Sequence, residues 1–321
     1  MLKRVLLFFL FDFLFTVMVV AKAAIPWGFW GHRHINYYAV FCLPEAMLPL
    51  FKTNADYLTR HAVDADQRRY LLAEEAARHY IDLDHYENES GEVCLPQNWK
   101  TACDSFSMDT LKAHGIVPFQ VYWSYLHLQK MFEAHDMNGV LKAAADLGHY
   151  VGDAHVPLHT TSNYNGQKTG QKGIHAFWES RIPELSGGQY SNFVPTVNYI
   201  DDPQSFIWEA VLESHRLLDT VFLMEMLVRK SLGEEELYTI AKKGQSLQRV
   251  INPVYARAYE EAMHGMVERR YRSAIHALSS LWYTAWVNAG QPTLPFEKVN
   301  IVADTLLLTQ DSCLVLPGHA E

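Results

Sequence analysis

Apolar residues recur every three or four positions through most of the chain, and few segments alternate with a period of two. Val140, Leu141, Ala144, Leu147 and Val151 form one such stripe, which is the pattern of a helix with one buried face. Hydrophobic residues make up 49% of the 321 residues, so the chain can bury a large core. The sequence therefore predicts an all-α fold, built as a single multi-helix domain.

The ends of two long helices can be placed from local signals. Asp202 followed by Pro203 is a favourable helix start, because the acid can cap the first turn and Pro fits there. We expect this helix to run to about residue 233, and a second helix to span about 253–288. The segment 163–173 is rich in Gly, Asn and Gln and is predicted to be a loop.

The first 23 residues have the pattern of a secretory signal peptide. A short basic start, 1–4, precedes an apolar run at 5–20, and Ala21–Ala23 fits the small-x-small cleavage pattern. The run is short for a membrane span, and no other run approaches that length. We therefore expect an exported protein, secreted or periplasmic, with its all-α domain at 24–295 and a C-terminal tail at 296–321.

The charge of the chain limits its partners. Lys and Arg number 27 against 36 acidic residues, which gives a net charge of -9. An acidic protein is a poor candidate for holding nucleic acid by bulk electrostatics, although metal ions can supply positive charge locally. The 16 His residues make metal chemistry the first possibility to test. No stable protein partner is inferred.

The cysteines do not form a zinc finger, because no Cys-x-x-Cys spacing occurs among Cys42, Cys94, Cys103 and Cys313. In an exported protein, Cys94 and Cys103 could close a small disulfide loop. Free thiols are the alternative, and the sequence leaves both open.

The strongest local motif lies at residues 149–159. On a helix His149 and Asp153 are one turn apart and face the same way, so both can reach one metal ion. Pro157 is expected to end that helix, which leaves His159 just beyond it to face a second metal. Asp146, three residues before His149, is a candidate acceptor that would orient the His149 ring.

A second motif, His175 and Glu179, again places two potential ligands one helical turn apart. Together with His159 it supplies two nitrogens and one carboxylate. Three protein ligands with open positions are typical of catalytic zinc rather than of a closed structural site.

Two weaker motifs precede these: Trp27 with His32, and Asp64 with His79. The order of all four resembles that found in the superfamily of zinc-dependent phospholipases C and S-one/P-one nucleases. Members of that superfamily are secreted, all-α, three-zinc phosphodiesterases. The order is carried here by Trp27, His32, Asp64, His79, His149, Asp153, His159, His175 and Glu179.

The resemblance implies up to three zinc ions and assigns their ligands. One zinc would be held by Asp64, His79, His149 and Asp153, a second by His32, Asp153 and the backbone of Trp27, and the third by His159, His175 and Glu179.

The resemblance also implies the catalytic residues. Asp153 would bridge two zinc ions, and Asp64 would hold one of them, so that a zinc-activated water can attack phosphorus. Arg68 is the candidate for stabilising charge on the phosphate. The nuclease family places its Arg three residues after the ligand Asp, where this chain has Gln67, so the Arg68 assignment departs from the family pattern.

The resemblance leaves the substrate open between two branches. Tyr80 and Asp82, directly after His79, match the nuclease branch, in which the aromatic ring stacks on a base and the acid binds its edge. Glu179 at the last ligand position matches the phospholipase C branch. The balance of these features favours a nuclease for single-stranded nucleic acid, with a phospholipase C as the alternative. A secreted zinc-binding protein without turnover is the third possibility.

Overall fold

A computed structural model describes residues 28–243 and 246–299. The predicted signal peptide, Trp27 and Cys313 lie outside the described residues, as does most of the predicted tail.

The described residues are mostly helical, which confirms the predicted fold class. The helices of the first half are α1 (Gly28–Val40), α2 (Leu48–Thr53), α3 (Ala55–His61), α4 (Asp64–Arg68), η1 (Ala73–His79), η2 (Leu83–His85), α5 (Trp99–Phe106), α6 (Met108–Ala113), α7 (Val117–Glu133) and α8 (Met137–Ala154). The elements of the second half are η3 (Pro157–Thr160), α9 (Ile174–Ala176), η4 (Phe177–Arg181), α10 (Ile182–Ser186), η5 (Gly187–Gln189), α11 (Pro203–Arg216), α12 (Leu218–Leu232), η6 (Glu234–Glu236), β1 (Tyr238–Lys243), β2 (Ser246–Ile251), α13 (Pro253–Ala262) and α14 (Met266–Asn288).

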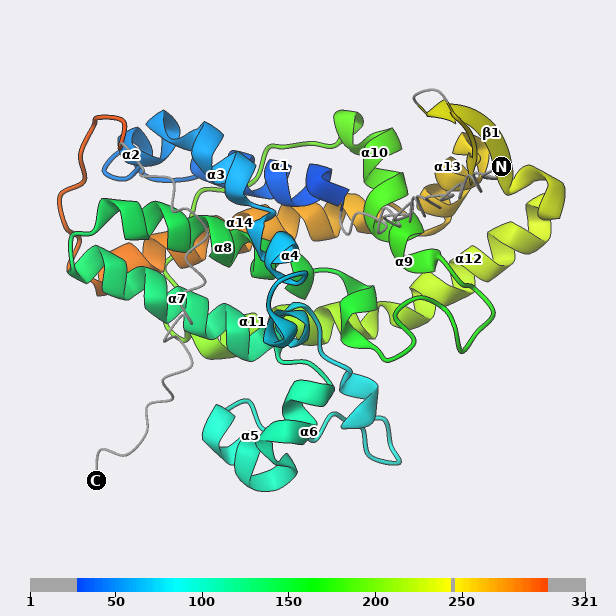
Figure 1. The fold of residues 1–321 in the computed structure, drawn as a ribbon, viewed down its shortest axis with the longest axis horizontal. Helices are drawn as coiled ribbons and strands as arrows, with labels where there is room; N and C mark the ends of the chain where they lie inside the picture. The colour runs from blue at the N-terminus through cyan, green and yellow to red at the C-terminus, as the bar shows by residue number, and fades with distance from the viewer. Residues whose placement is uncertain (1–27, 244–245, 300–321) are drawn as a thin grey trace, which may run out of the picture.

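Helix α8 is the centre of the fold. It packs against α7, α1, α3 and α14, and Figure 1 shows α1, α8 and α14 side by side, with α5 and α6 in a small lobe apart from them. From Val140 to Ala154 nearly every residue of α8 is buried, which is expected of a helix covered on all sides. Polar side chains on this helix are therefore held away from water.

Two glycines allow α1 to approach α8 closely. A methyl group added at Gly148 would lie 1.8 Å from Asn36 Oδ1, and one at Gly152 would lie 2.8 Å from His32 Nδ1. Asn36 also ties the two helices together, since its Nδ2 donates to the carbonyl oxygen of Ala145 at 3.1 Å. This close approach brings His32 of α1 beside the C-terminal half of α8.

The helix predicted from Asp202 begins where expected. The Asp202 side chain accepts a hydrogen bond from the Ser205 amide at 3.1 Å, but the helix is interrupted at Leu217 and continues as α12 up to Gly233. The helix predicted at 253–288 is likewise two helices, α13 and α14, with Gly265 between them at φ 72°. The segment 163–173 is a loop of turns, as predicted.

The antiparallel hairpin of β1 and β2 was not predicted. Its register pairs Tyr238 with Ile251 and Lys242 with Leu247, and the hairpin lies next to α12 and α13 at one end of the molecule (Figure 1). β-branched residues occur in both strands, Thr239 and Ile240 in β1 and Val250 and Ile251 in β2, but this short signal stands between two helical segments.

The described cysteines Cys42, Cys94 and Cys103 all carry free thiols. The disulfide considered between Cys94 and Cys103 is therefore not formed in the structure. Among the described helices, none combines the length and the apolar character needed to cross a membrane.

Candidate metal centre

Three groups of side chains in the described part of the chain place enough nitrogen and oxygen atoms together to hold a metal ion. In each group the potential ligand atoms lie within 4.8 Å of one another. The first group is His32, His149 and Asp153; the second is Asp66, His79 and His149; the third is His159, His175 and Glu179. The first two share His149, so they form one continuous cluster.

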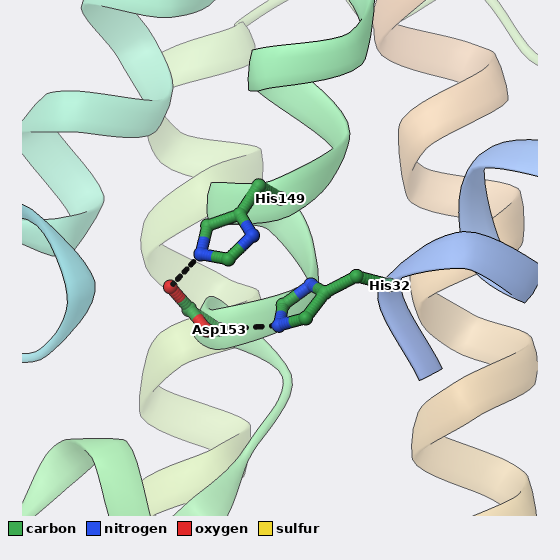
Figure 2. Close-up of side chains that lie close together, drawn as sticks. All are labelled: His32, His149 and Asp153. Atoms are coloured by element: carbon green, nitrogen blue, oxygen red, sulfur yellow. Dashed lines mark ion pairs between the residues drawn. The ribbon is translucent and has the colours of Figure 1, made fainter. Parts of the chain in front are cut away.

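The Asp153 carboxylate lies at the centre of this cluster. Its Oδ2 atom is 2.9 Å from His79 Nδ1 and 3.3 Å from His149 Nε2. Its Oδ1 atom is 3.6 Å from His32 Nε2 and 3.7 Å from His159 Nδ1. Figure 2 shows His149 and His32 approaching this carboxylate from α8 and α1. A single carboxylate thus faces ring nitrogens on two sides, which is the geometry needed to bridge two cations.

The acidic residue in the second group is Asp66, not Asp64. Asp66 is buried, and its Oδ1 atom is 3.9 Å from His149 Nε2 and 4.0 Å from His79 Nδ1. Asp64 lies outside all three groups and instead pairs with His61 Nδ1 at 2.6 Å, with its side chain 37% exposed. On the short helix α4, two residues correspond to about 200° of rotation, so only one of these acids can face α8.

The third group is built on three short elements after α8. Glu179 Oε2 is 2.5 Å from His175 Nε2 and 3.5 Å from His159 Nε2. Glu179 lies in η4, a π-helical turn, and Pro183, four residues on, has no N–H to donate to the Glu179 carbonyl. Single π-turns of this kind are frequent at functional sites. His175 and Glu179 therefore meet on one face, as the sequence predicts, but on a π-turn rather than a regular α-helix.

Backbone carbonyls fix which ring nitrogen points into the cluster. His149 Nδ1 lies 2.9 Å from the Ala62 carbonyl oxygen, and His159 Nδ1 contacts the His79 carbonyl oxygen. Because a carbonyl can only accept, each Nδ1 is a donor, so in the neutral ring that binds a metal the lone pair lies on Nε2. Both Nε2 atoms face the acidic members of their groups, as a metal ligand must.

The donor set fits a bound cation. Several buried atoms of these groups make no hydrogen bond: Asp66 Oδ2, His79 Nε2, His159 Nε2 and Glu179 Oε1. Buried polar atoms without partners are rare because each costs about 1–3 kcal/mol. Imidazole nitrogens with one or two carboxylates are ligands that zinc prefers, so a cation would satisfy atoms that the protein leaves unpaired.

The pKa values of the cluster also favour a bound cation. Burial lowers the pKa of His149, but the Asp153 and Asp66 carboxylates outweigh it and raise the pKa to about 9. His159 behaves likewise beside Asp153 and Glu179, with a pKa of about 9. Despite its burial, the pKa of Asp153 is held well below its usual value by His149 and His159. The Asp153 carboxylate thus stays ionised and attracts positive charge.

Arg68 and Asp146 do not take the places predicted for them. Arg68 Nη1 donates to Asp146 Oδ1 at 3.1 Å, and its Nη2 lies 3.6 Å from Glu75 Oε1. Asp146 is therefore engaged by Arg68, and the backbone of Ala62, rather than Asp146, orients His149. An arginine does follow the buried acid Asp66 at a spacing of three residues. Arg69 lies three residues on, partly exposed, with Nη1 3.6 Å from Asp66 Oδ1.

Tyr80 and Asp82 lie on the segment that pairs with His159. The amide of Ile81 between them donates to the His159 carbonyl oxygen at 2.8 Å. The Tyr80 hydroxyl donates to the Ala113 carbonyl oxygen at 3.3 Å, and both side chains are half-buried.

The acid of this segment has a partner that sequence reasoning missed. Asp82 Oδ2 is 3.3 Å from His114 Nδ1, and the His114 ring stacks on His85 at 3.5 Å. His114 lies 35 residues from His79 in a segment with no motif of its own, so spacing gives no signal for it.

The remaining predicted ligand, Trp27, lies outside the described residues. His155, which lies between Asp153 and His159 in the sequence, belongs to none of the three groups. Its Nδ1 contacts the Val151 carbonyl oxygen at 2.7 Å, and its ring lines a separate cavity of about 490 Å³ between α11 and α14.

No protein-family model matches this chain, and no curated protein sequence does.

Proposed function

We propose that this protein is a zinc-dependent phosphodiester hydrolase and that its substrate is single-stranded nucleic acid. The observation that carries the proposal is the position of Asp153. Its two carboxylate oxygens lie within 3.7 Å of ring nitrogens from His32 and His159 on one side and His79 and His149 on the other. A carboxylate shared in this way is what a closely spaced pair of cations requires.

The residues that would hold zinc follow from the three groups. Zinc bound there would act as a Lewis acid, lowering the pKa of a coordinated water and neutralising charge on a phosphate. Asp66, His79, His149 and one oxygen of Asp153 would form one site, His32 and the other oxygen of Asp153 the adjoining one, and His159, His175 and Glu179 the third.

Residues around these groups supply the other needs of phosphodiester cleavage. Arg69, partly exposed beside Asp66, is a guanidinium able to bind a phosphate oxygen. Tyr80 offers a half-buried ring on which a base can stack. Asp82, paired with His114, offers an acceptor for the edge of that base. These features together favour a nucleic acid over a lipid.

A phospholipase C is the second candidate. It rests on Glu179, since the phospholipase branch favours Glu over Asp at the last ligand position. The same three groups would then act on a phospholipid head group. Both candidate functions require that the protein bind metal. If neither substrate class were cleaved, zinc binding without turnover would remain.

A substrate panel on zinc-loaded protein tests the proposal. Single-stranded DNA, RNA, 3′-nucleotides and phosphatidylcholine are compared side by side at equal enzyme concentration. Cleavage of single-stranded DNA or RNA at least tenfold faster than phosphatidylcholine supports a nuclease. The reverse order supports a phospholipase C, and no turnover of any substrate would leave a zinc-binding protein.

The variant Tyr80→Ala sharpens this test. Since base stacking contributes about 1–3 kcal/mol, KM for single-stranded DNA should rise several-fold to a hundredfold, while turnover of a small chromogenic phosphodiester changes little. Tyr199→Ala is the matched control, because Tyr199 is a partly exposed tyrosine bonded to Asn288 at the far end of α14. Equal effects of Tyr80→Ala on both substrates would contradict base stacking.

A further inference from the structure

A second set of charged side chains lies directly behind the metal-binding face of His79. Its central member is Glu75, which is fully buried and one helical turn before His79 in η1. We propose that Glu75 is a positioning residue that holds the His79 ring with Nδ1 directed at the metal, a role that rests on the zinc binding proposed above. Glu75 belongs to none of the three ligand groups.

The two ring nitrogens of His79 face in opposite directions. Nδ1 faces the cluster, 3.0 Å from His149 Nε2 and 4.0 Å from Asp66 Oδ1. Nε2 points the other way, is buried, and makes no hydrogen bond. Glu75 Oε1 lies 3.7 Å from this Nε2, close enough that a small rotation of the ring forms a hydrogen bond.

The chemistry of the pair sets the tautomer of His79. A carboxylate can only accept, so Glu75 favours the proton on Nε2 and leaves the Nδ1 lone pair for a metal. A carboxylate behind a ligating imidazole also raises the basicity of that ligand. His79 differs here from His149 and His159, whose rings are oriented by backbone carbonyls instead.

Glu75 is itself held in place from three directions. Arg78 Nη1 donates to Glu75 Oε2 at 2.9 Å, the Tyr150 hydroxyl donates to Oε1, and Arg68 Nη2 lies 3.6 Å from Oε1. Burial raises the pKa of Glu75, but the neighbouring His79, together with these three contacts, outweighs it and lowers the pKa to about 2. The carboxylate is therefore charged and has little freedom to turn away from His79.

The partners of Glu75 come from the three segments that supply the second ligand group, which is Asp66, His79 and His149. Arg68 lies two residues after Asp66, and Tyr150 directly follows His149. Arg68 also reaches Asp146 on α8 at 3.1 Å. These side-chain contacts thus link the three segments that carry Asp66, His79 and His149. Arg68 would therefore help to position the metal ligands rather than bind the phosphate.

Glu75→Gln tests the proposal by metal affinity. An amide can turn its NH₂ group toward Nε2 and favour the wrong tautomer, so zinc affinity should fall about 10- to 100-fold, the range seen when the outer partner of a ligand is removed. The measurement is chelator competition with zinc alone, together with the visible absorption of bound Co²⁺, which should change in intensity and position. Glu74→Gln is the matched control, because Glu74 is the exposed neighbour of Glu75, and it should change neither.

The outcomes separate this inference from the proposed function. If the wild-type protein binds no zinc, the proposed function fails first. If the wild-type protein binds zinc and Glu75→Gln binds it equally tightly with an unchanged Co²⁺ spectrum, only the positioning role is overturned. A lower melting temperature of the metal-free variant with unchanged zinc affinity also overturns it, since that is the signature of a purely structural residue.

A milder variant covers the case in which Glu75→Gln does not fold. Tyr150→Phe keeps the buried ring and removes only the hydroxyl that donates to Glu75. We expect zinc affinity to fall several-fold, with a smaller change in the Co²⁺ spectrum. Unchanged affinity in this variant would overturn the proposal.

Discussion

Two groups of buried charged side chains lie on either side of the last turn of α8, and they differ in whether the protein satisfies them. Arg270 of α14 makes four hydrogen bonds within the fold: to the carbonyl oxygens of His155 and Ala210, to the hydroxyl of Ser214 and to the carboxylate of Glu213. Asp153 lies two residues before His155. The cluster around Asp153 leaves several buried nitrogen and oxygen atoms without a hydrogen bond.

The difference separates a structural charge from a functional one. A buried charge costs several kcal/mol unless its hydrogen-bonding capacity is met. Arg270 meets that requirement with fixed groups of α11 and α8, so it needs no ligand and pins the helices together. The Asp153 cluster does not meet it, and a bound cation is the simplest partner that would. A cluster of unsatisfied imidazole and carboxylate atoms, rather than burial or charge alone, therefore marks the candidate site.

The strongest test of this contrast is Asp153→Asn. Because one carboxylate faces two of the ligand groups, its loss should weaken two metal sites at once. Phosphodiester hydrolysis should fall at least a thousandfold, a barrier increase of about 4 kcal/mol. The helical circular dichroism should be largely retained. Elemental analysis should show fewer bound zinc ions than in the wild-type protein, and more than a tenth of the wild-type rate would contradict a bridging role.

Arg270→Met tests the other side of the turn. The two carbonyl oxygens lose their donor, at about 1–3 kcal/mol each, while Glu213, 55% exposed, can regain water. We expect a loss of about 2 kcal/mol of unfolding free energy, or roughly 4–8 °C in Tm. The zinc content measured well below Tm should not change. Loss of zinc without loss of stability would remove the distinction drawn between the two groups.

Spacing along the sequence grouped the candidate ligands better than it placed the ends of the helices around them. The structure brings together His32, His79, His149, Asp153, His159, His175 and Glu179, all of which were selected from spacing and order. Helical spacing of three or four residues is a local property, so the sequence reports it directly.

The mistakes arise where tertiary packing decides between equivalent local patterns. Asp64 and Asp66 are both acids on α4, and only the packing of that helix against α8 determines which one faces His149. The break at Gly265 does have a local signal, a glycine at φ 72°, which the continuing apolar pattern obscures. Arg68 was assigned from its spacing to Asp64, which lies outside the three ligand groups.

Asp66→Asn, with Asp64→Asn as its matched control, sharpens the boundary of the unsatisfied cluster. Asp66 is a buried member of a ligand group, whereas Asp64 pairs with His61 near the surface. We expect zinc affinity to fall at least tenfold in the first variant, about 1.4 kcal/mol, and less than twofold in the second. Chelator competition measures both, and the reverse order would restore Asp64 as the ligand.

Gly152→Ala tests how closely the cluster depends on the approach of α1 to α8. The added methyl group would lie 2.8 Å from His32 Nδ1, so the His32 ring must shift away from Asp153 by several tenths of an ångström. Only the first ligand group contains His32. We therefore expect one zinc to be lost at a several-fold lower chelator concentration, with the others unaffected. Gly188→Ala is the matched control, because a methyl group there meets no atom within 4 Å. Equal chelator resistance of the two variants would show that His32 does not contribute to a metal site. The candidate metal site beside the last turn of α8 would then be reduced to Asp66, His79 and His149.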